Sequence, residues 1–148
     1  MFGFKKGTQL MNLQTVSEFL DTQETCVLST VSSEGWPMSA TVGFSHDSEF
    51  AILIGTDTTT RKYKNLNNNS KVSIVVGVTS PRTVQIQGVA KEVNADDIAN
   101  RLELHFNKVP FAKTFLNNPG QRYFIIKPTW LRMTDYSQKP SIFETEEF

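Results

Sequence analysis

Two antiparallel strands joined by a turn are predicted by the stretch Thr25-Cys26-Val27-Leu28-Ser29-Thr30-Val31-Ser32-Ser33-Glu34-Gly35-Trp36-Pro37-Met38-Ser39-Ala40-Thr41-Val42-Gly43-Phe44. Its first part is apolar and β-branched, which favours a strand. The polar residues and the glycine at 32–35 form a turn signal. After Pro37, apolar side chains alternate with small and polar ones, so the second strand is predicted to bury one face.

Working outward from this hairpin, further strands are predicted at 50–56, 71–78, 83–93 and 122–133. In the strand 83–93, the apolar residues before Gly88, Val84 and Ile86, occupy even-numbered positions, whereas Val89 and Val93 after it occupy odd-numbered ones. This one-residue shift in the alternation predicts a β-bulge at Gly88. Helices are predicted at 12–21, 58–69, 95–107 and 111–116. Clustered strands with short helices between them indicate a mainly β, antiparallel α+β or barrel architecture and argue against a parallel doubly wound sheet.

Length and composition predict one domain, spanning residues 1–148, with an acidic tail at 135–148. Lys and Arg together number 15, as do Asp and Glu, so the basic excess of a nucleic-acid-binding protein is missing. No apolar stretch is long enough to span a membrane, and residues 1–10 lack the apolar core of a signal peptide. We therefore expect a cytoplasmic protein that binds neither nucleic acid nor membrane. Cys26, the single cysteine, is interpreted as a buried hydrophobic residue rather than a redox thiol.

The stretch Thr56-Asp57-Thr58-Thr59-Thr60-Arg61-Lys62 carries the clearest sign of chemistry. A strand ends, a hydroxyl-rich turn follows, and a helix begins with two cations in its first turn. Cations at this end oppose the helix dipole, so a bound anion would compensate them. Free backbone N–H groups, hydroxyls and two cations together predict a phosphate site. A solvated helix end with a harmless basic pair is the alternative interpretation.

This stretch resembles the pyridoxamine-phosphate-oxidase-like family, in which a strand ending in Thr is followed four residues on by a Ser/Thr-Arg-Lys triplet. The N-terminal helix, the strand 25–31, the Glu34-Gly35-Trp36-Pro37 turn and the strand Thr83-Val84-Gln85-Ile86-Gln87-Gly88-Val89-Ala90 are similar to the family as well. The resemblance covers residues 13–136. It implies a six-stranded antiparallel split β-barrel with peripheral helices that binds flavin mononucleotide (FMN) between the two subunits of a homodimer.

Carried over residue by residue, the resemblance places the flavin phosphate at Thr60, Arg61 and Lys62. The strand that flanks the ring falls on 40–45, the next strand meets the flavin at Gly55 and Thr56, and Thr83 stands where longer members place a Gln. Trp130, in the last strand, is assigned either to the ring or dimer interface or to a half-buried strand position. The complete set of predicted cofactor-binding residues is Ala40, Thr41, Val42, Gly43, Gly55, Thr56, Thr60, Arg61, Lys62, Thr83 and Trp130.

Several positions depart from the vitamin B6 oxidase itself. Ala40 replaces an Arg of that enzyme, Ser45 replaces a substrate-contacting Lys, and its C-terminal Arg-Leu-His-Asp-Arg motif is represented only by Arg132-Met133-Thr134-Asp135-Tyr136. The chain therefore resembles the short relatives, which include general-stress proteins, nitroimidazole-resistance proteins and flavin reductases.

The resemblance implies a flavin-dependent oxidoreductase that acts on a small organic molecule with a nicotinamide electron donor, NADH or NADPH. A flavin-binding stress-response or redox carrier without turnover is the alternative, and a haem- or oligonucleotide-binding β-barrel is a lower one. No catalytic side chain is assigned, because hydride arrives at the flavin itself. His46 is interpreted as a solvated turn residue and His105 as a packing residue, and no metal site is predicted.

Overall fold

The computed structural model describes residues 11–137 and 141–148; residues 1–10, for which the sequence predicts no signal peptide, lie outside them. The strands are β1 (Thr25–Val31), β2 (Pro37–Gly43), β3 (Ser45–His46), β4 (Ile52–Asp57), β5 (Lys71–Val76), β6 (Arg82–Val93), β7 (Gln121–Asp135) and β8 (Ser141–Thr145). The helices are α1 (Leu13–Asp21), α2 (Arg61–Asn68) and α3 (Ala99–Lys108), with 3₁₀ turns η1 (Ala95–Ile98) and η2 (Pro110–Phe115). Among the residues described, no helix has the length and apolar character to cross a membrane.

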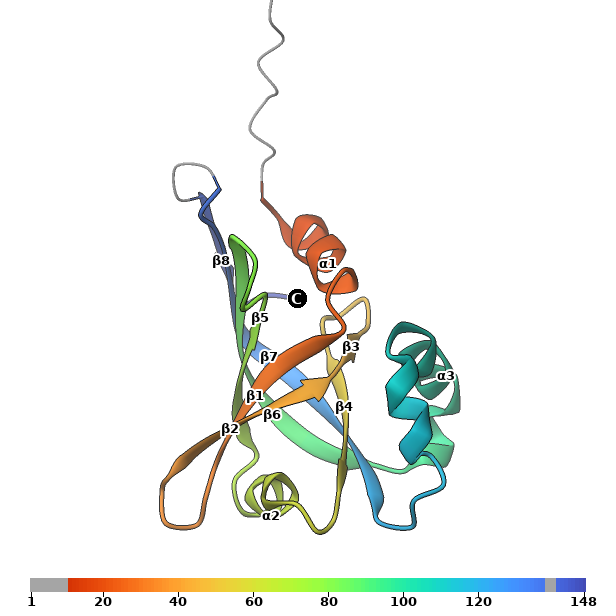
Figure 1. Cartoon of the computed structure of the whole chain (residues 1–148). Helices are drawn as coiled ribbons and strands as arrows, with labels where there is room; N and C mark the ends of the chain where they lie inside the picture. Colours follow the sequence, from red (N-terminus) through yellow and green to blue (C-terminus); the bar gives the residue numbers. More distant parts are fainter. Residues whose placement is uncertain (1–10, 138–140) are drawn as a thin grey trace, which may run out of the picture.

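The strands form one antiparallel sheet in the order β2-β1-β5-β6-β7-β4-β3, with β8 added to β7. The two ends of this order are joined by the chain itself, because β2 runs into β3 through Phe44 (Figure 1). The sheet therefore curls into a barrel that is open between β2 and β4, which confirms the predicted split β-barrel. The described residues form eight strands where six were predicted; the two additional ones are β3, which is only two residues long, and β8, which lies in the predicted tail.

The predicted acidic tail, 135–148, of which residues 138–140 lie outside the described residues, contains the strand β8. Residues of β8 pair with β7 from Leu131↔Thr145 to Asp135↔Ser141. Phe143 packs against the core from this strand. β8 therefore adds to the sheet along the part of β7 that β4 does not pair.

The predicted bulge occurs at Gly88, but its extra residue lies on the neighbouring strand. The partner of Gln87 is Trp130 and the partner of Gly88 is Pro128, so Thr129 of β7 is unpaired. The strand β6 keeps its alternation without a shift, and Val89 is exposed. The predicted change of apolar phase is therefore wrong, because the partner strand absorbs the irregularity.

The main core fills the barrel, and two helices close its ends (Figure 1). α1 closes one end with Val16, Phe19 and Leu20. Asn12 is the N-cap of this helix, and its side chain accepts a hydrogen bond from the Thr15 N–H at 3.0 Å. α2 closes the opposite end, which places its first turn at the rim of the barrel near the end of β4.

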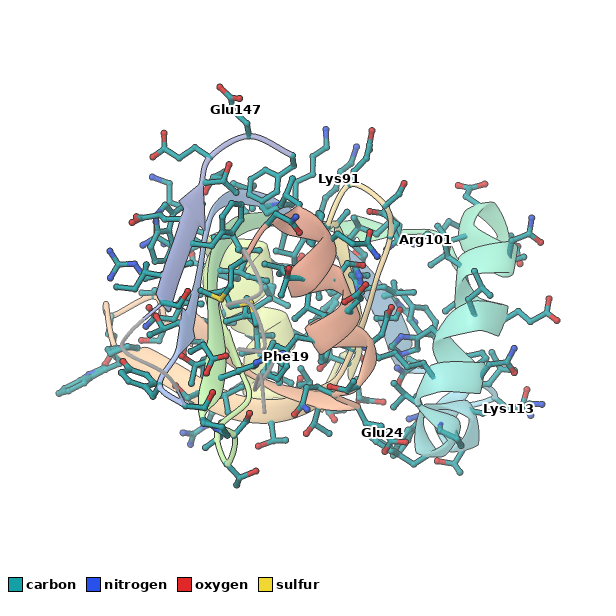
Figure 2. The ribbon with its side chains drawn as sticks, turned by 90° about the horizontal axis from the view of Figure 1, so that it is seen from above. Phe19, Glu24, Lys91, Arg101, Lys113 and Glu147 are labelled. Carbon is teal, nitrogen blue, oxygen red and sulfur yellow. The ribbon has the colours of Figure 1, made fainter. Side chains whose placement is uncertain are left out.

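A second, smaller core lies outside the barrel under α3. It joins Leu102 of α3 to Leu53 of β4 and Tyr123 of β7. Arg101 fixes the helix to the β3–β4 turn by donating to the Ala51 carbonyl at 2.9 Å and by pairing with Asp47 at 3.3 Å. Figure 2 shows α3 and the following turn standing beside the barrel, whereas α1 lies over its mouth. The space between this outer helix and the open side of the barrel becomes the candidate site.

Candidate functional site

A cavity of about 300 Å³ lies at the split between β2 and β4, and η2 and α3 cover it. Most of its strand residues point away from the barrel interior. Its lining residues are Thr41, Val42, Gly43, Gly55, Thr56, Asp57, Thr60, Lys62, His105, Phe111, Ala112, Phe115, Gln121 and Tyr123. This volume is at the lower end of small-molecule sites.

Seven of the eleven predicted cofactor-binding residues line this one cavity, although they come from β2, β4 and α2. They are Thr41, Val42, Gly43, Gly55, Thr56, Thr60 and Lys62. The other four do not line it. Ala40 lies on the barrel-facing side of β2 together with Val42, and Arg61 is the exposed first residue of α2, beside Lys62.

Thr83 and Trp130 lie elsewhere on the sheet. Thr83 lies near the start of β6 and pairs with Thr134. The cavity lies at the other end of β6, where Val93 pairs with the cavity residue Tyr123. Trp130 donates its indole N–H to Glu144 of β8, and the Arg132 guanidinium lies 5.8 Å from its ring centroid. Within one chain these two predicted residues are therefore separated from the cavity.

The α2 end of the cavity has the features of an anion site. Thr60 is the N-cap, and its hydroxyl accepts from the Tyr63 N–H at 3.2 Å. The backbone N–H groups of Arg61 and Lys62 donate to no acceptor among the residues described. Arg61, Lys62 and Lys64 all lie in the first turn, which contains no acidic residue, and none of the three forms an ion pair within residues 11–137 and 141–148. Free donors and uncompensated cations at a helix N-terminus fit a phosphate group.

Asp57 also lines this end, but its carboxylate is engaged in the loop. It accepts hydrogen bonds from the Thr59 N–H at 2.8 Å and from the Asn118 amide at 2.7 Å. Hydrogen bonding from Thr59 lowers the pKa of this carboxyl below its ordinary value. The Thr58 N–H donates to the Gly120 carbonyl at 3.0 Å, so the turn before α2 is tied to the turn before β7.

Two glycines let other side chains approach the strands of the cavity. A Cβ on Gly43 would lie 2.6 Å from Val109 Cγ1, and a Cβ on Gly55 would collide with the Gln121 side-chain amide. Gly55 pairs directly with Tyr123, whose ring lies against it. The missing side chains therefore create room where β2, β4 and η2 converge.

His105 and Tyr123 are the buried polar side chains that sequence reasoning missed as site residues. His105 is 1% exposed, and its Nδ1 lies 2.8 Å from the Ser45 hydroxyl. Burial, reinforced by nearby Lys108 and Arg101, lowers the pKa of His105 to about 4, so the imidazole is neutral at neutral pH. Tyr123 is 4% exposed, its hydroxyl is buried without a hydrogen-bond partner among the described residues, and burial raises its pKa. A packing role for His105 agrees with its burial, but the residue faces the cavity as well.

His46 is not a solvated turn residue, so that prediction is wrong. Its side chain is 5% exposed because it lies between α1 and the β3–β4 turn. Its Nε2 lies 3.0 Å from the Ser17 hydroxyl, and its ring stacks on Phe50. Cys26 is buried as predicted, and burial raises its pKa to about 12, which keeps the thiol protonated. No group of three His, Cys, Asp or Glu residues in the described part of the chain could hold a metal ion.

Comparison with known proteins identifies a family whose model matches this chain. The family model described as Pyridoxamine 5'-phosphate oxidase matches residues 13–135. No curated protein sequence matches the chain. Among solved structures, General Stress Protein 26 of Bacillus anthracis is 20% identical with a TM-score of 0.65, over 89% of this chain and 97% of that one.

Two structurally similar proteins are named for haem. HutZ, the heme storage protein of Vibrio cholerae, is 18% identical with a TM-score of 0.65, over 88% of this chain and 92% of that one. A heme binding protein of Mycobacterium smegmatis is 17% identical with a TM-score of 0.72 over 88% of this chain. The chain spans just over half, 56%, of the Mycobacterium protein. At these identities the similarities establish the fold.

Proposed function

The chain belongs to the pyridoxamine 5'-phosphate oxidase family, and from this premise we propose that it is a flavoprotein that binds FMN in the cavity between β2, β4 and α2. The proposed activity is that of an oxidoreductase, which passes electrons from NADH or NADPH to a small organic substrate. A flavin-binding redox carrier without turnover is the alternative within the same cofactor class.

The α2 end of the cavity carries the proposal. Backbone N–H groups without an acceptor and cations without an ion-pair partner among the described residues meet there, at Arg61 and Lys62, directly after the N-cap Thr60. The Thr56 and Thr60 hydroxyls lie 2.8 Å apart, which fixes the helix end against the floor of the cavity. A phosphate bound at this point would gain charge-assisted hydrogen bonds and a favourable helix dipole. The ribityl chain and ring would then extend along Gly55 and Thr41.

The chain's own residues would bind and orient the cofactor. Lys62 and the first N–H groups of α2 would hold the phosphate, and Thr41 and Thr56, which also line the cavity, would offer hydroxyls to the flavin. Phe111 and Phe115 would exclude water from one side. When bound, the flavin supplies the hydride chemistry, so an acidic or basic catalytic side chain is not required.

We also propose a homodimer that forms through the outer face of the sheet. Most side chains on this face of β1, β2, β5 and β6 are uncharged, among them Val27, Ser29, Ser39, Thr41, Ser73, Val75, Gln85 and Gln87, and Lys71 and Lys91 are its charged residues. A depression of about 490 Å³ crosses it. A mostly uncharged, accessible sheet face is suited to a second subunit. Thr83 and Trp130 lie on this side of β6 and β7, so in a dimer they would approach the partner's cavity rather than their own.

The purified protein, titrated with FMN and followed by visible absorption, tests the cofactor. The expected result is a shifted flavin spectrum with saturable binding of one FMN per chain, and a protein that takes up no FMN would refute the proposal. Anaerobic addition of NADH or NADPH to the loaded protein then separates the two alternatives. Bleaching of the flavin is expected of the oxidoreductase, whereas an unchanged spectrum would indicate the carrier. Light scattering in the same samples should give the mass of a dimer.

Haem is a second candidate ligand, because His105 lines the cavity with a neutral imidazole whose Nε2 forms no hydrogen bond among the described residues. Such a nitrogen can serve as an axial ligand. Titration with hemin tests this directly. A red-shifted Soret band in the wild type that is lost in His105→Ala would favour haem over FMN.

A further inference from the structure

Two polar atoms of buried side chains in the cavity form no hydrogen bond within the described part of the chain. Tyr123 is almost completely buried, yet its hydroxyl forms no hydrogen bond. His105 is also buried, and with Nδ1 beside Ser45 its Nε2 is left without a partner. Folded proteins satisfy most buried polar atoms, because an unsatisfied one is costly. Two such atoms on one cavity point to a ligand that satisfies them.

We propose that the end of the cavity formed by His105, Tyr123, Phe111 and Phe115 is a substrate subsite for an uncharged planar ring compound that carries a carbonyl or ring-nitrogen acceptor. The Tyr123 hydroxyl donates to that acceptor. His105 Nε2 forms a second hydrogen bond, as donor or acceptor according to the tautomer that Ser45 stabilises. Because it names a substrate, this inference rests on the proposed function, in which the flavin phosphate binds at the end of the cavity near Lys62.

The charges of the cavity explain why the ligand is uncharged here. Its charged side chains, Lys62 and Asp57, both lie at the α2 end. At the other end the pKa of His105 is lowered to about 4 by burial and the pKa of Tyr123 is raised, so both side chains are neutral at neutral pH. Lys108, whose ammonium lies over the Phe44 ring at 3.7 Å, does not line the cavity. An anionic group would lose its hydration at this end without gaining a countercharge.

The shape of the ligand follows from the aromatic residues of η2. Phe111 and Phe115 are each 48% exposed, although both line the cavity. Half-exposed phenyl rings at the edge of a cavity offer faces against which a flat ring stacks.

Isothermal titration with coumarin, an uncharged two-ring lactone that is redox-inert, tests the subsite against its anionic counterpart, coumarin carboxylate. Protein with and without FMN is used. Wild type is expected to bind coumarin at least tenfold more tightly than the carboxylate. Tyr123→Phe should weaken coumarin binding roughly three- to tenfold, the effect of one hydrogen bond. The matched control Tyr136→Phe, which removes an exposed hydroxyl outside the cavity, should leave it unchanged.

The stability of Tyr123→Phe without ligand supplies a second readout. Loss of an unsatisfied buried hydroxyl should leave the melting temperature unchanged or raise it, whereas a hydroxyl with a purely structural role would lower it. The chain has two His residues, so the imidazole signal of His105 can be followed by NMR, and it should shift on coumarin addition.

Each of three results would overturn the proposed subsite. The first is equal coumarin affinity in wild type and Tyr123→Phe, the second is wild-type affinity for coumarin carboxylate equal to that for coumarin, and the third is no coumarin binding. FMN binding together with any of these results would leave the flavin proposal in place. If coumarin binds as expected but FMN does not bind, the flavin proposal would be refuted and the ring-binding subsite would stand.

Discussion

The hydroxyl oxygens of Thr56 and Thr60 lie 2.8 Å apart, and this contact joins the end of β4 to the first turn of α2. Thr60 also donates to the Asp57 carbonyl at 2.8 Å and accepts from the Tyr63 N–H. One side chain therefore fixes the helix start, the preceding turn and the cavity floor in a single arrangement. The position of the cations Arg61 and Lys62 depends on it.

Thr60→Ala is expected to destabilise the protein and to weaken FMN binding. The loss of an N-cap hydroxyl costs about 0.5–2 kcal/mol, which chemical denaturation can measure. Thr58→Ala is the matched control, because it lies in the same turn and its hydroxyl forms no hydrogen bond with the described residues. Equal losses of stability in the two variants would contradict the capping role.

Replacing both Arg61 and Lys62 with Ala should weaken FMN binding by at least two orders of magnitude. Each lost charge-assisted contact is worth about 1.5–3 kcal/mol. The control variant Lys127→Ala removes a cation from an exposed position on β7, outside the cavity, and should bind FMN like the wild type. Fluorescence titration at two salt concentrations measures both. Unchanged affinity in the first variant would place the phosphate elsewhere.

His105 should make stability depend on pH between its unfolded and folded pKa values. Burial lowers the pKa of His105 from 6.5 to about 4, so in this range the unfolded chain binds a proton that the native protein does not. The free energy of unfolding should therefore decrease as the pH falls from 6.5 towards 4, by roughly 3 kcal/mol at full loss. Above pH 6.5 this contribution is fully present.

His105→Gln removes this titration, and the difference between the wild-type and variant unfolding curves isolates it. The burial-lowered pKa of His46 and the carboxylate titrations are common to both proteins. Curves that remain parallel from pH 7 to pH 4 would show that His105 is not buried in its neutral form.

Two glycines are expected to respond differently to alanine. A Cβ on Gly88 would lie 2.6 Å from the Lys127 carbonyl oxygen, a backbone atom, so Gly88→Ala should cost about 1–3 kcal/mol. A Cβ on Gly55 meets the end of the flexible Gln121 side chain, which can move. Gly55→Ala should therefore fold with a smaller loss but weaken FMN binding. Thermal unfolding and FMN titration of both variants check this, and the opposite order of stabilities would contradict it.

Local features were predictable from the sequence because they depend on neighbouring residues. The placement of Arg61 and Lys62 in the first turn of α2 follows from a few consecutive positions, although the helix begins at Arg61, after the N-cap Thr60, and not at residue 58 as predicted. The period-two alternation of residues 37–43 identified β2 in the same way. The family motif lies in such segments, so seven of the predicted residues meet in the cavity.

The sequence by itself therefore determined the barrel class, the hairpin of β1 and β2, and the cationic helix start. Only the tertiary structure decided that Tyr123 lies against Gly55 and that His105 reaches the cavity from an outer helix. These contacts join residues that are far apart in the chain, and they depend on strand register and on how α3 packs. A shift of one residue in the β4–β7 register would turn Tyr123 to the other face, and no local pattern records that choice.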